Sequence, residues 1–357
     1  MTVTKDNNTD QSVSQDGCVT EFEEAATPCL FCGSECSKVR FTFKDPTGRA
    51  YRLRDCLNCQ ARFIDPTPTR DELAKAYDAA YYGKGSGKFS GPVEAVLDRF
   101  RRGRAVRLAK LLPDRARVLD IGCGNGGFLR ALHALGSFEL HGVELPGPAA
   151  ERTSRYPFIQ LKTGTLDQSD FPAASLDAVT LFHVFEHLDN PRDVLEMAVN
   201  FLRPGGYLVL SFPNIASLQA RMFRANWFHL DPPRHLCFLP PAAFRKQAEA
   251  RGLRILSERY FSPEQNPFGF QQSLLNLFQT RRDALFEDMK GNRLHNSARG
   301  RFGLIIQRIF VVLTGAGFVA VDALESVLRT GATVEFVAQK DGDADSTSSG
   351  KTLTEQE

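Results

Sequence analysis

The 357-residue chain lacks several features that mark large classes of protein. No uninterrupted apolar stretch reaches the roughly 20 residues that a membrane-spanning helix needs; the longest, Ile309–Val321, has 13 residues. The N-terminal stretch MTVTKDNNTDQSVSQDG has no apolar segment of the kind that secretory signals carry. The net charge is only +2, and no repeat of a solenoid period is present. We therefore expect neither a spanning nor a secreted protein, and neither a nucleic-acid coat nor a solenoid.

The two ends of the chain are polar and have no hydrophobic periodicity. Residues 1–25 and 341–357 are rich in Asn, Asp, Gln, Ser and Thr. Such segments bury too little apolar surface to fold, so we predict a disordered leader and a disordered tail. Without a secretory signal we expect a cytoplasmic location, where thiols stay reduced.

Four cysteines near the start of the ordered region form two CxxC pairs, Cys29 with Cys32 and Cys56 with Cys59, separated by 23 residues. Two such pairs can supply four thiolates to one tetrahedral ion. Four free thiols, or a redox-active pair, are the alternatives. Because no open position is left for catalysis, we predict a structural Zn²⁺ ion in a module that spans 26–66.

Strand and helix patterns alternate from Arg117 onward. After a helical lead-in at 67–112, the expected strands and helices are 118–121, 128–135 (helix), 140–145, 158–161, 177–182, 191–202 (helix), 207–212, 253–260 and 333–338. This alternation predicts an α/β fold with a largely parallel sheet. Ligands of such sheets bind at the carboxyl ends of the strands.

The first strand of this region runs into a glycine-rich loop. Asp120, Gly122, Gly124 and the pair 126–127 satisfy both GxGxxG and DxGxGxG, and Glu144 ends the next strand. The glycines allow a tight turn and a close approach of a ligand to the backbone. By itself the loop leaves open NAD, another adenosine cofactor, or a turn without a ligand.

Two segments further along the chain resolve this choice. LDAVTLFHVFEHLDNP lies at 176–191 and LRPGGYLVLSFPN at 202–214. Together with the glycine loop they resemble the class I S-adenosylmethionine (SAM)-dependent methyltransferases, in the branch of the ubiquinone-biosynthesis O-methyltransferases. The resemblance covers about 113–260. It implies a Rossmann-like, seven-stranded SAM-dependent methyltransferase fold, here with a zinc-ribbon-like module before it and a helical insertion near the C-terminus.

The N-terminal part also resembles known proteins. A cysteine module followed by Tyr77, Tyr81 and Tyr82 is similar to bacterial methyltransferases with a zinc-binding N-terminus. Several of those are found with cell-surface polysaccharide or lipid biosynthesis. The resemblance therefore implies a small-molecule, glycosyl or lipid-linked acceptor.

The methyltransferase resemblance implies a set of cofactor contacts. Asp120 would approach the methionine amino group of SAM, Gly122 and Gly124 would let the backbone meet the methionine moiety, and Glu144 would bind the ribose hydroxyls. Thr165 follows the third strand, near the expected place of the adenine. The full set of implied cofactor-binding residues is Asp120, Gly122, Gly124, Glu144, Thr165 and Tyr82.

Methyl transfer from a sulfonium requires alignment of the acceptor and, for a hydroxyl acceptor, removal of a proton. A histidine has a suitable ordinary pKa. His183 follows the fourth strand, near the expected methyl-bearing end of the cofactor. With Glu186 and His187 it has the spacing of one helical face. In ubiquinone O-methyltransferases a more acidic version of this face can hold a divalent cation; the alternative here is simple capping and packing.

A second histidine site lies in the loop at 227–238, after the fifth strand. The resemblance implies a histidine here that faces the acceptor. His235 is our predicted general base and Asp231 the residue that orients it, whereas His229 competes for the same role and Arg234 is a candidate to hold an anionic acceptor. The predicted catalytic residues are therefore His235, His183 and Asp231.

About 70 residues separate the sixth and seventh predicted strands, which is more than a loop needs. We predict a helical cover over the acceptor at 262–331. Its apolar part, 302–328, forms either a helical hairpin packed on the core or an interfacial helix in peripheral contact with a membrane. The predicted segments are 1–25, 26–66, 67–112, 113–261, 262–331, 332–340 (final core strand) and 341–357.

The sequence thus predicts an SAM-dependent methyltransferase, with oxygen as the favoured acceptor atom and a structural Zn²⁺. Three other functions stay open. The basic stretch 98–107 beside a zinc module is compatible with an RNA methyltransferase, although the balanced charge makes nucleic acid an unfavoured partner. A sugar C-methyltransferase is a second alternative. A SAM-binding partner subunit without activity is the third.

Overall fold

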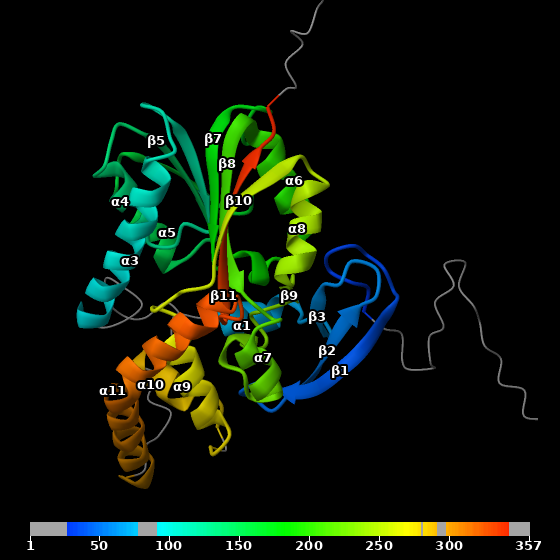
Figure 1. Ribbon diagram of the computed structural model, residues 1–357, viewed down its shortest axis with the longest axis vertical. Coiled ribbons are helices and arrows are strands. Elements are labelled where there is room, and N and C mark those ends of the chain that lie inside the picture. The colour runs from blue at the N-terminus through cyan, green and yellow to red at the C-terminus, as the bar shows by residue number, and fades with distance from the viewer. Residues whose placement is uncertain (1–26, 78–90, 280, 291–297, 343–357) are drawn as a thin grey trace, which may run out of the picture.

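The computed structural model describes residues 27–77, 91–279, 281–290 and 298–342. The predicted leader, most of the predicted tail, and Tyr81 and Tyr82 lie outside the described residues. Figure 1 shows a large twisted sheet with helices on both faces, a smaller sheet beside it, and a group of helices below.

The large sheet has seven strands in the order β10-β11-β8-β7-β4-β5-β6. Their bounds are β4 Arg117–Ile121, β5 Glu139–Glu144, β6 Ile159–Thr163, β7 Leu176–Phe182, β8 Leu202–Pro213, β10 Leu253–Arg259 and β11 Thr333–Lys340. The strands from β8 to β6 pair in parallel, whereas β11 runs antiparallel to both β8 and β10. This confirms the predicted seven-stranded α/β fold, and it places the carboxyl ends of five strands at one edge.

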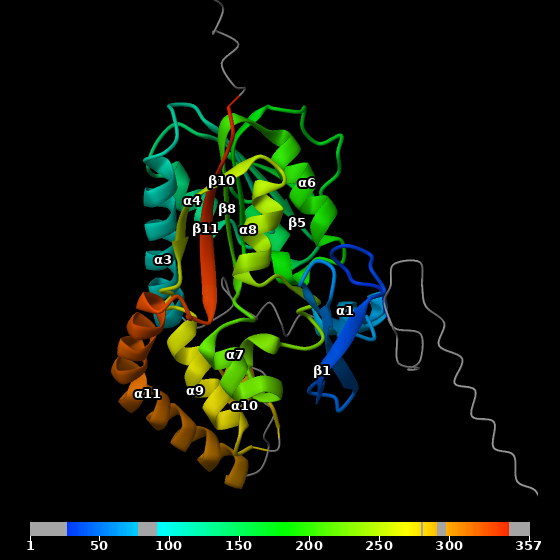
Figure 2. The same ribbon diagram turned by 45° about the vertical axis from the view of Figure 1, so that its right-hand side comes forward.

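Helices cover the two faces of this sheet. Figures 1 and 2 place α3 (Gly91–Ala109) and α4 (Gly127–His133) on one face, with α6 (Pro191–Phe201) and α8 (Pro241–Glu249) on the other. The short α5 (Pro148–Thr153) follows β5. In α6 the apolar residues recur at helical spacing and are buried: Val194, Leu195, Ala198 and Phe201. The core is therefore continuous between sheet and helices.

The smaller sheet has the order β1-β2-β3-β9. Its strands are β1 Ser37–Lys44, β2 Ala50–Cys56, β3 Arg62–Asp65 and β9 Cys237–Phe238. The first three belong to the predicted zinc module, but β9 comes from the segment assigned to the methyltransferase core. The module is thus completed by the core, which joins the two parts through main-chain hydrogen bonds.

Within the helical lead-in predicted at 67–112, α1 (Arg70–Ala76) begins at Arg70, because Thr69 and Glu72 form a capping box there. Residues 78–90 of this lead-in lie outside the described residues. After β8 the chain forms α7 (Leu218–Phe223) and the short 3₁₀ turns η2 (Arg224–Asn226) and η3 (Phe228–Leu230).

Three helices connect β10 to β11, in the segment predicted to cover the acceptor: α9 (Asn266–Asn276), α10 (Ala284–Met289) and α11 (Ala298–Val327). Of the two alternatives for 302–328, the hairpin is wrong, since α11 is one helix of 30 residues. Gly303, Gly315 and Gly317 do not interrupt it. Its segment Phe302–Val327 is long and apolar enough to cross a membrane by length and composition, which corrects the estimate taken from the 13-residue run.

Candidate functional site

The glycine loop lies at the carboxyl end of β4, as the sequence predicts for a ligand site. Gly122, Gly124 and Gly126 have φ angles of +68°, +58° and +72°, in the left-handed region that favours glycine. Gly122 and Gly124, the two glycines predicted to contact the cofactor, differ in their surroundings. A Cβ added to Gly122 would lie 2.4 Å from Cγ2 of Val184, whereas one added to Gly124 would meet nothing within 4 Å. Gly122 therefore serves packing, and Gly124 faces open space.

Asp120 lies under this loop and is almost fully buried. Its Oδ1 accepts a hydrogen bond of 2.6 Å from the hydroxyl of Thr180 on the neighbouring strand β7. Burial raises the pKa of Asp120 to about 7, and the nearby Glu144 adds to the rise. A buried carboxylate with so little compensation favours a cationic ligand.

Glu144 ends β5 and reaches across to the loop. Its Oε2 accepts the Gly124 N–H at 2.7 Å, and its Oε1 accepts the Leu145 N–H at 3.1 Å. Burial raises the pKa of Glu144, while these two backbone donors oppose the rise. Each oxygen keeps a second lone pair, so the carboxylate can also accept hydroxyl groups. Leu145 is 48% exposed and adds an apolar surface beside it.

Thr165 lies just beyond β6, the strand that pairs with β5, and is exposed. Thr163 is opposite Glu144 in that pairing, and the Gly164 N–H donates to the Glu144 carbonyl. The sheet thus brings Thr165 to the same edge as the predicted ribose-binding residue.

A cavity of about 150 Å³ opens at the carboxyl edge of the sheet, and His183 is one of its lining residues. His183 has φ +56°, in the left-handed region that residues other than glycine rarely adopt. Burial, together with the charge of Arg104, lowers its pKa to about 4. The imidazole is therefore neutral at physiological pH.

The wall of the cavity opposite His183 is charged. Arg104 on α3 contacts Glu264 at 2.5 Å and Glu335 at 3.2 Å, and Arg107 contacts Glu335 at 2.7 Å. Arg101, on the same helix, pairs with two acidic residues of its own helix. Three arginines of the basic stretch 98–107 thus hold acidic partners, which leaves less free positive charge for RNA.

His235 and Asp231, the other predicted catalytic residues, are not among the residues that line this cavity. His235 is buried, and its Nδ1 lies 2.7 Å from the carbonyl of His229, so Nδ1–H is the donor and Nε2 the acceptor. Nε2 lies 3.7 Å from Asp231 Oδ2 and 4.0 Å from Glu186 Oε1. Burial lowers the pKa of His235 well below its ordinary value.

Asp231 also forms a close ion pair with Arg234. Burial acts to raise the pKa of Asp231, but the charges of Arg234 and His235 outweigh it and lower that pKa. Because Arg234 pairs with a residue of its own loop and reaches the carbonyl of Ala76, it is engaged rather than poised for an anionic acceptor.

The segment of His183, Glu186 and His187 is not a regular helix, because the 3₁₀ turn η1 spans only Phe185–His187. His183 Nδ1 still lies 3.6 Å from Glu186 Oε1. The ligand atoms of Glu186, His187 and His235 instead lie within 4.8 Å of one another. Burial raises the pKa of Glu186 to about 7, and among the described residues its Oε2 has no hydrogen-bond partner. The Tyr77 hydroxyl lies 2.8 Å from Nδ1 of His187, which ties α1 to this group.

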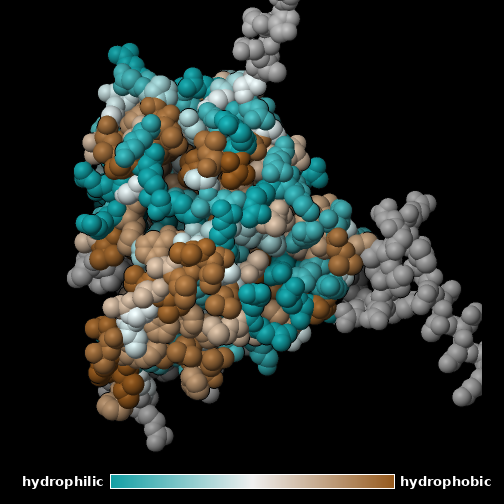
Figure 3. All heavy atoms as spheres, in the orientation of Figure 1, coloured by the Kyte–Doolittle hydropathy of each residue, from teal (hydrophilic) through white to brown (hydrophobic). Residues whose placement is uncertain are grey.

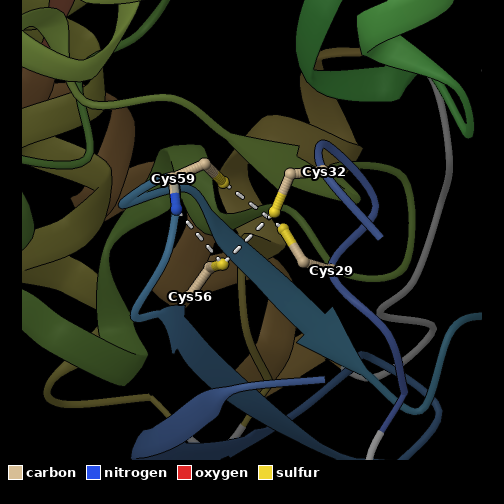
Figure 4. A group of neighbouring side chains, drawn as sticks. All are labelled: Cys29, Cys32, Cys56 and Cys59. Carbon is tan, nitrogen blue, oxygen red and sulfur yellow. Dashed lines mark hydrogen bonds between the residues drawn. The ribbon is translucent and has the colours of Figure 1, made fainter. Parts of the chain in front are cut away.

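The four cysteines of the N-terminal module converge, as Figure 4 shows. Cys29 Sγ and Cys59 Sγ lie 3.6 Å apart, as do Cys32 Sγ and Cys56 Sγ, and all four sulfurs lie within 4.8 Å of one another. A tetrahedral zinc ion with bonds near 2.3 Å would separate its sulfurs by about 3.8 Å. The four thiols therefore fit a zinc ion.

Sequence reasoning missed several residues of the site. Thr180 and Val184 support the glycine loop, and Arg104, Arg107 and Glu335 line the cavity. Only the arginines had a signal, since Arg104 and Arg107 are three residues apart on one face of a helix. Glu335 lies on the last strand and comes to the cavity only because β11 inserts beside β8.

Comparisons with known proteins agree with this geometry. Residues 96–258 match the methyltransferase domain family. A probable S-adenosylmethionine-dependent methyltransferase of Mycolicibacterium smegmatis is 35% identical over 134 residues, which are 36% of this chain and 51% of that protein. The ubiquinone biosynthesis O-methyltransferase of Xanthomonas axonopodis is 32% identical over 115 residues, 30% of this chain and 46% of that protein. The chain thus spans about half the length of these relatives.

Among solved structures, a SAM-dependent methyltransferase from Archaeoglobus fulgidus aligns with 20% identity and a TM-score of 0.42, covering 68% of this chain and 94% of that one. The assignment rests on the family match and on the strand order. Residues 96–258, with the rest of the seven-stranded sheet, form a class I SAM-dependent methyltransferase domain.

Proposed function

We propose that the protein transfers the methyl group of SAM to an oxygen atom of a small-molecule, glycosyl or lipid-linked acceptor. The observation that carries the proposal is the open space at Gly124, bordered by the carboxylate of Glu144 and adjacent to the buried Asp120. The ubiquinone O-methyltransferase relative supports an oxygen acceptor.

The residues of the glycine loop fit SAM by their chemistry. Asp120 would hold the methionine ammonium, because a buried carboxylate gains most from a cationic partner. Gly122 and Gly124 would border the methionine moiety. Glu144 would accept the ribose hydroxyls, and Thr165 with the apolar Leu145 would border the adenine. SAM itself supplies an electrophilic methyl group on a sulfonium.

His183 is our proposed proton acceptor, because it lines the cavity at the edge where the cofactor loop lies. It would take the proton that the acceptor hydroxyl loses as its oxygen gains the methyl group. His235 is the second candidate: the carbonyl of His229 fixes its ring through Nδ1, and its Nε2 faces Asp231 at 3.7 Å. Its burial beside Glu186 favours a supporting role.

The four cysteines would hold a structural Zn²⁺ that fixes the N-terminal module. The module supplies three strands to the small sheet, and β9 leads directly from the loop of His229, Asp231 and His235. Zinc would therefore stabilise the loop through β9 without contacting either substrate.

The test of cofactor binding is calorimetric titration of SAM into the purified protein and two variants. Glu144→Gln should weaken binding by roughly 10- to 100-fold, since it removes a charged acceptor from two hydroxyls. Glu139→Gln is the matched control: it lies at the opposite end of the same strand, partly exposed, and should leave binding unchanged. Equal affinity of both variants would refute the assignment.

The test of transfer is incubation with tritiated SAM and a membrane-containing extract of the host, with label counted in organic, polar and RNase-sensitive fractions. His183→Asn should lower the rate by about 100-fold while SAM binding persists. His133→Asn, on the exposed side of α4, is its control. If His235→Asn lowers the transfer rate more than His183→Asn does, at unchanged stability, His235 is the proton acceptor instead. Label confined to RNase-sensitive material would replace the proposed acceptor with RNA.

A further inference from the structure

Helix α11 exposes a continuous apolar face. Only 6% of its most apolar window is buried, and the mean hydropathy there is 2.1. On a helical wheel the outward side chains fall on one side, and in the described chain none of them between Phe302 and Leu328 is polar except Arg308, at the margin. The large apolar ones are Phe302, Ile305, Ile306, Ile309, Val312, Leu313, Val319, Leu324, Val327 and Leu328. We call these residues the α11 face.

The opposite side of α11 is fastened to the protein. Gln271 on α9 donates to the Val311 carbonyl and to the Thr314 hydroxyl, and Phe270 packs on Phe318 with ring centroids 4.9 Å apart. Near the C-terminal end, buried Asp322 accepts from the Asn266 side chain. The helix is thus held with its apolar face outward, and Figure 3 shows hydrophobic residues gathered over this part of the molecule.

The way α11 is fastened excludes an orientation across a bilayer. Near its N-terminal end Leu304 packs in a cluster with Leu285 of α10, and Arg308 pairs with Asp288 of the same short helix. At its other end the chain enters β11 of the central sheet at Thr333. Both ends are joined to one folded body, so a crossing would carry the polar side chains of α9 and α10 into hydrocarbon.

Charge at the N-terminal end of α11 indicates which surface it meets. The sequence has Arg299 and Arg301 there, and between Lys290 and Val321 it has no Asp or Glu. Helix α9 runs antiparallel to α11, so Phe278, which is 85% exposed, lies toward the same end. A basic first turn in the sequence of an otherwise apolar helix is typical of a helix that lies on an anionic membrane.

We propose that the α11 face docks the protein on an anionic lipid bilayer, with the helix lying in the plane of the interface. A bilayer requires no hydrogen-bonding groups from the face, whereas protein interfaces carry about ten hydrogen bonds and a polar rim. The α11 face offers none of these groups along its length. The exposed area also exceeds the isolated apolar side chains that are normal on soluble proteins.

The cavity lined by His183 lies next to the docked segment, and what this means for the acceptor rests on the proposed function. Its lining residues Phe261–Glu264 lie where the chain leaves the sheet for α9, and Thr333–Glu335 lie where it returns from α11. The docked segment therefore borders the candidate acceptor site. An amphiphilic acceptor could keep its tail in the bilayer while its polar group enters the cavity.

Vesicle flotation of the full chain tests the docking. The protein should float with vesicles of phosphatidylcholine and phosphatidylglycerol, and at least about 10-fold less with phosphatidylcholine alone. Val312→Gln/Leu313→Gln replaces two side chains that are 79% and 77% exposed, and should lower flotation by at least about 10-fold. Val96→Gln/Leu256→Gln, two exposed apolar residues outside the α11 face, should float as the parent does.

The other outcomes overturn the proposal. Absence of flotation with either vesicle, or equal flotation of the α11 variant, refutes docking by this face. A stable dimer in solution that the α11 variant abolishes would identify a second copy as the occupant. Resistance of the bound protein to alkaline carbonate extraction would refute the in-plane orientation. SAM titration of each variant shows that it is folded, and keeps failure of docking distinct from failure of the methyltransferase assignment.

Discussion

Replacing Gly122 by alanine should damage the fold, whereas the same change at Gly124 should damage ligand binding. Both residues have positive φ, so alanine costs about 1–2 kcal/mol at either position. At Gly122 the new methyl would also lie 2.4 Å from Cγ2 and 3.3 Å from Cβ of Val184. Because Cβ is itself close, rotation of the short valine side chain cannot relieve the contact. Overpacking of this kind adds about 1–3 kcal/mol.

Urea unfolding of the ligand-free protein measures this difference. We expect Gly122→Ala to lower the free energy of unfolding by about 2–5 kcal/mol, and Gly124→Ala by only about 1–2 kcal/mol. Gly124→Ala should weaken SAM binding instead, since its methyl enters the open space. Adding Val184→Ala to Gly122→Ala should recover about 1–3 kcal/mol relative to additive behaviour.

Two results would refute this reasoning. If the two glycine variants unfold within about 0.5 kcal/mol of each other, the contact with Val184 has no energetic weight. If the double variant behaves additively, the destabilisation of Gly122→Ala comes from the backbone alone. An unchanged affinity of Gly124→Ala for SAM would remove the open space as evidence for the cofactor site.

Three further predictions concern charge, metal and helix. Burial raises the pKa of Asp120 to about 7, so the carboxyl group is neutral below that pH. The affinity for SAM should therefore fall by up to about 10-fold for each pH unit below 7. Calorimetry of Asp120→Asn should find no such dependence of SAM affinity on pH. Cys56→Ser should lose the zinc that elemental analysis detects in the parent and should melt at lower temperature, whereas Cys36→Ser, outside the four-sulfur group, should keep it. Gly317→Ala in α11, where an added Cβ meets nothing within 4 Å, should stabilise the protein by about 0.5–1 kcal/mol in urea; destabilisation would mean that this position needs glycine.

The pH dependence of stability has the same origin as that of binding. A raised pKa means that folded Asp120 keeps its proton over the range from its ordinary value to about 7, where the unfolded chain has lost it. The free energy of unfolding therefore falls as pH rises through that range, by this group's contribution. SAM binding would restore part of this lost free energy of unfolding, because its ammonium group supplies a cation to Asp120.

The errors of the sequence-based predictions have physical causes. The helical face of His183, Glu186 and His187 assumed a regular helix, but His183 takes a left-handed conformation that ends the strand before η1 begins. The hairpin alternative for 302–328 would have required glycines or a charge to break the helix. In α11 the glycines are accommodated, and Arg308 is neutralised by Asp288.

The sequence by itself determined the features that depend on neighbouring residues. The glycine loop needs left-handed backbone at Gly122, Gly124 and Gly126, and the two CxxC pairs need only local turns, so both could be recognised from their spacing. The strand order, which packs residues far apart in the chain, decided the rest. It alone brings Arg104, His183 and Glu335 around one cavity, completes the cysteine module with β9, and turns the apolar face of α11 outward rather than into the core.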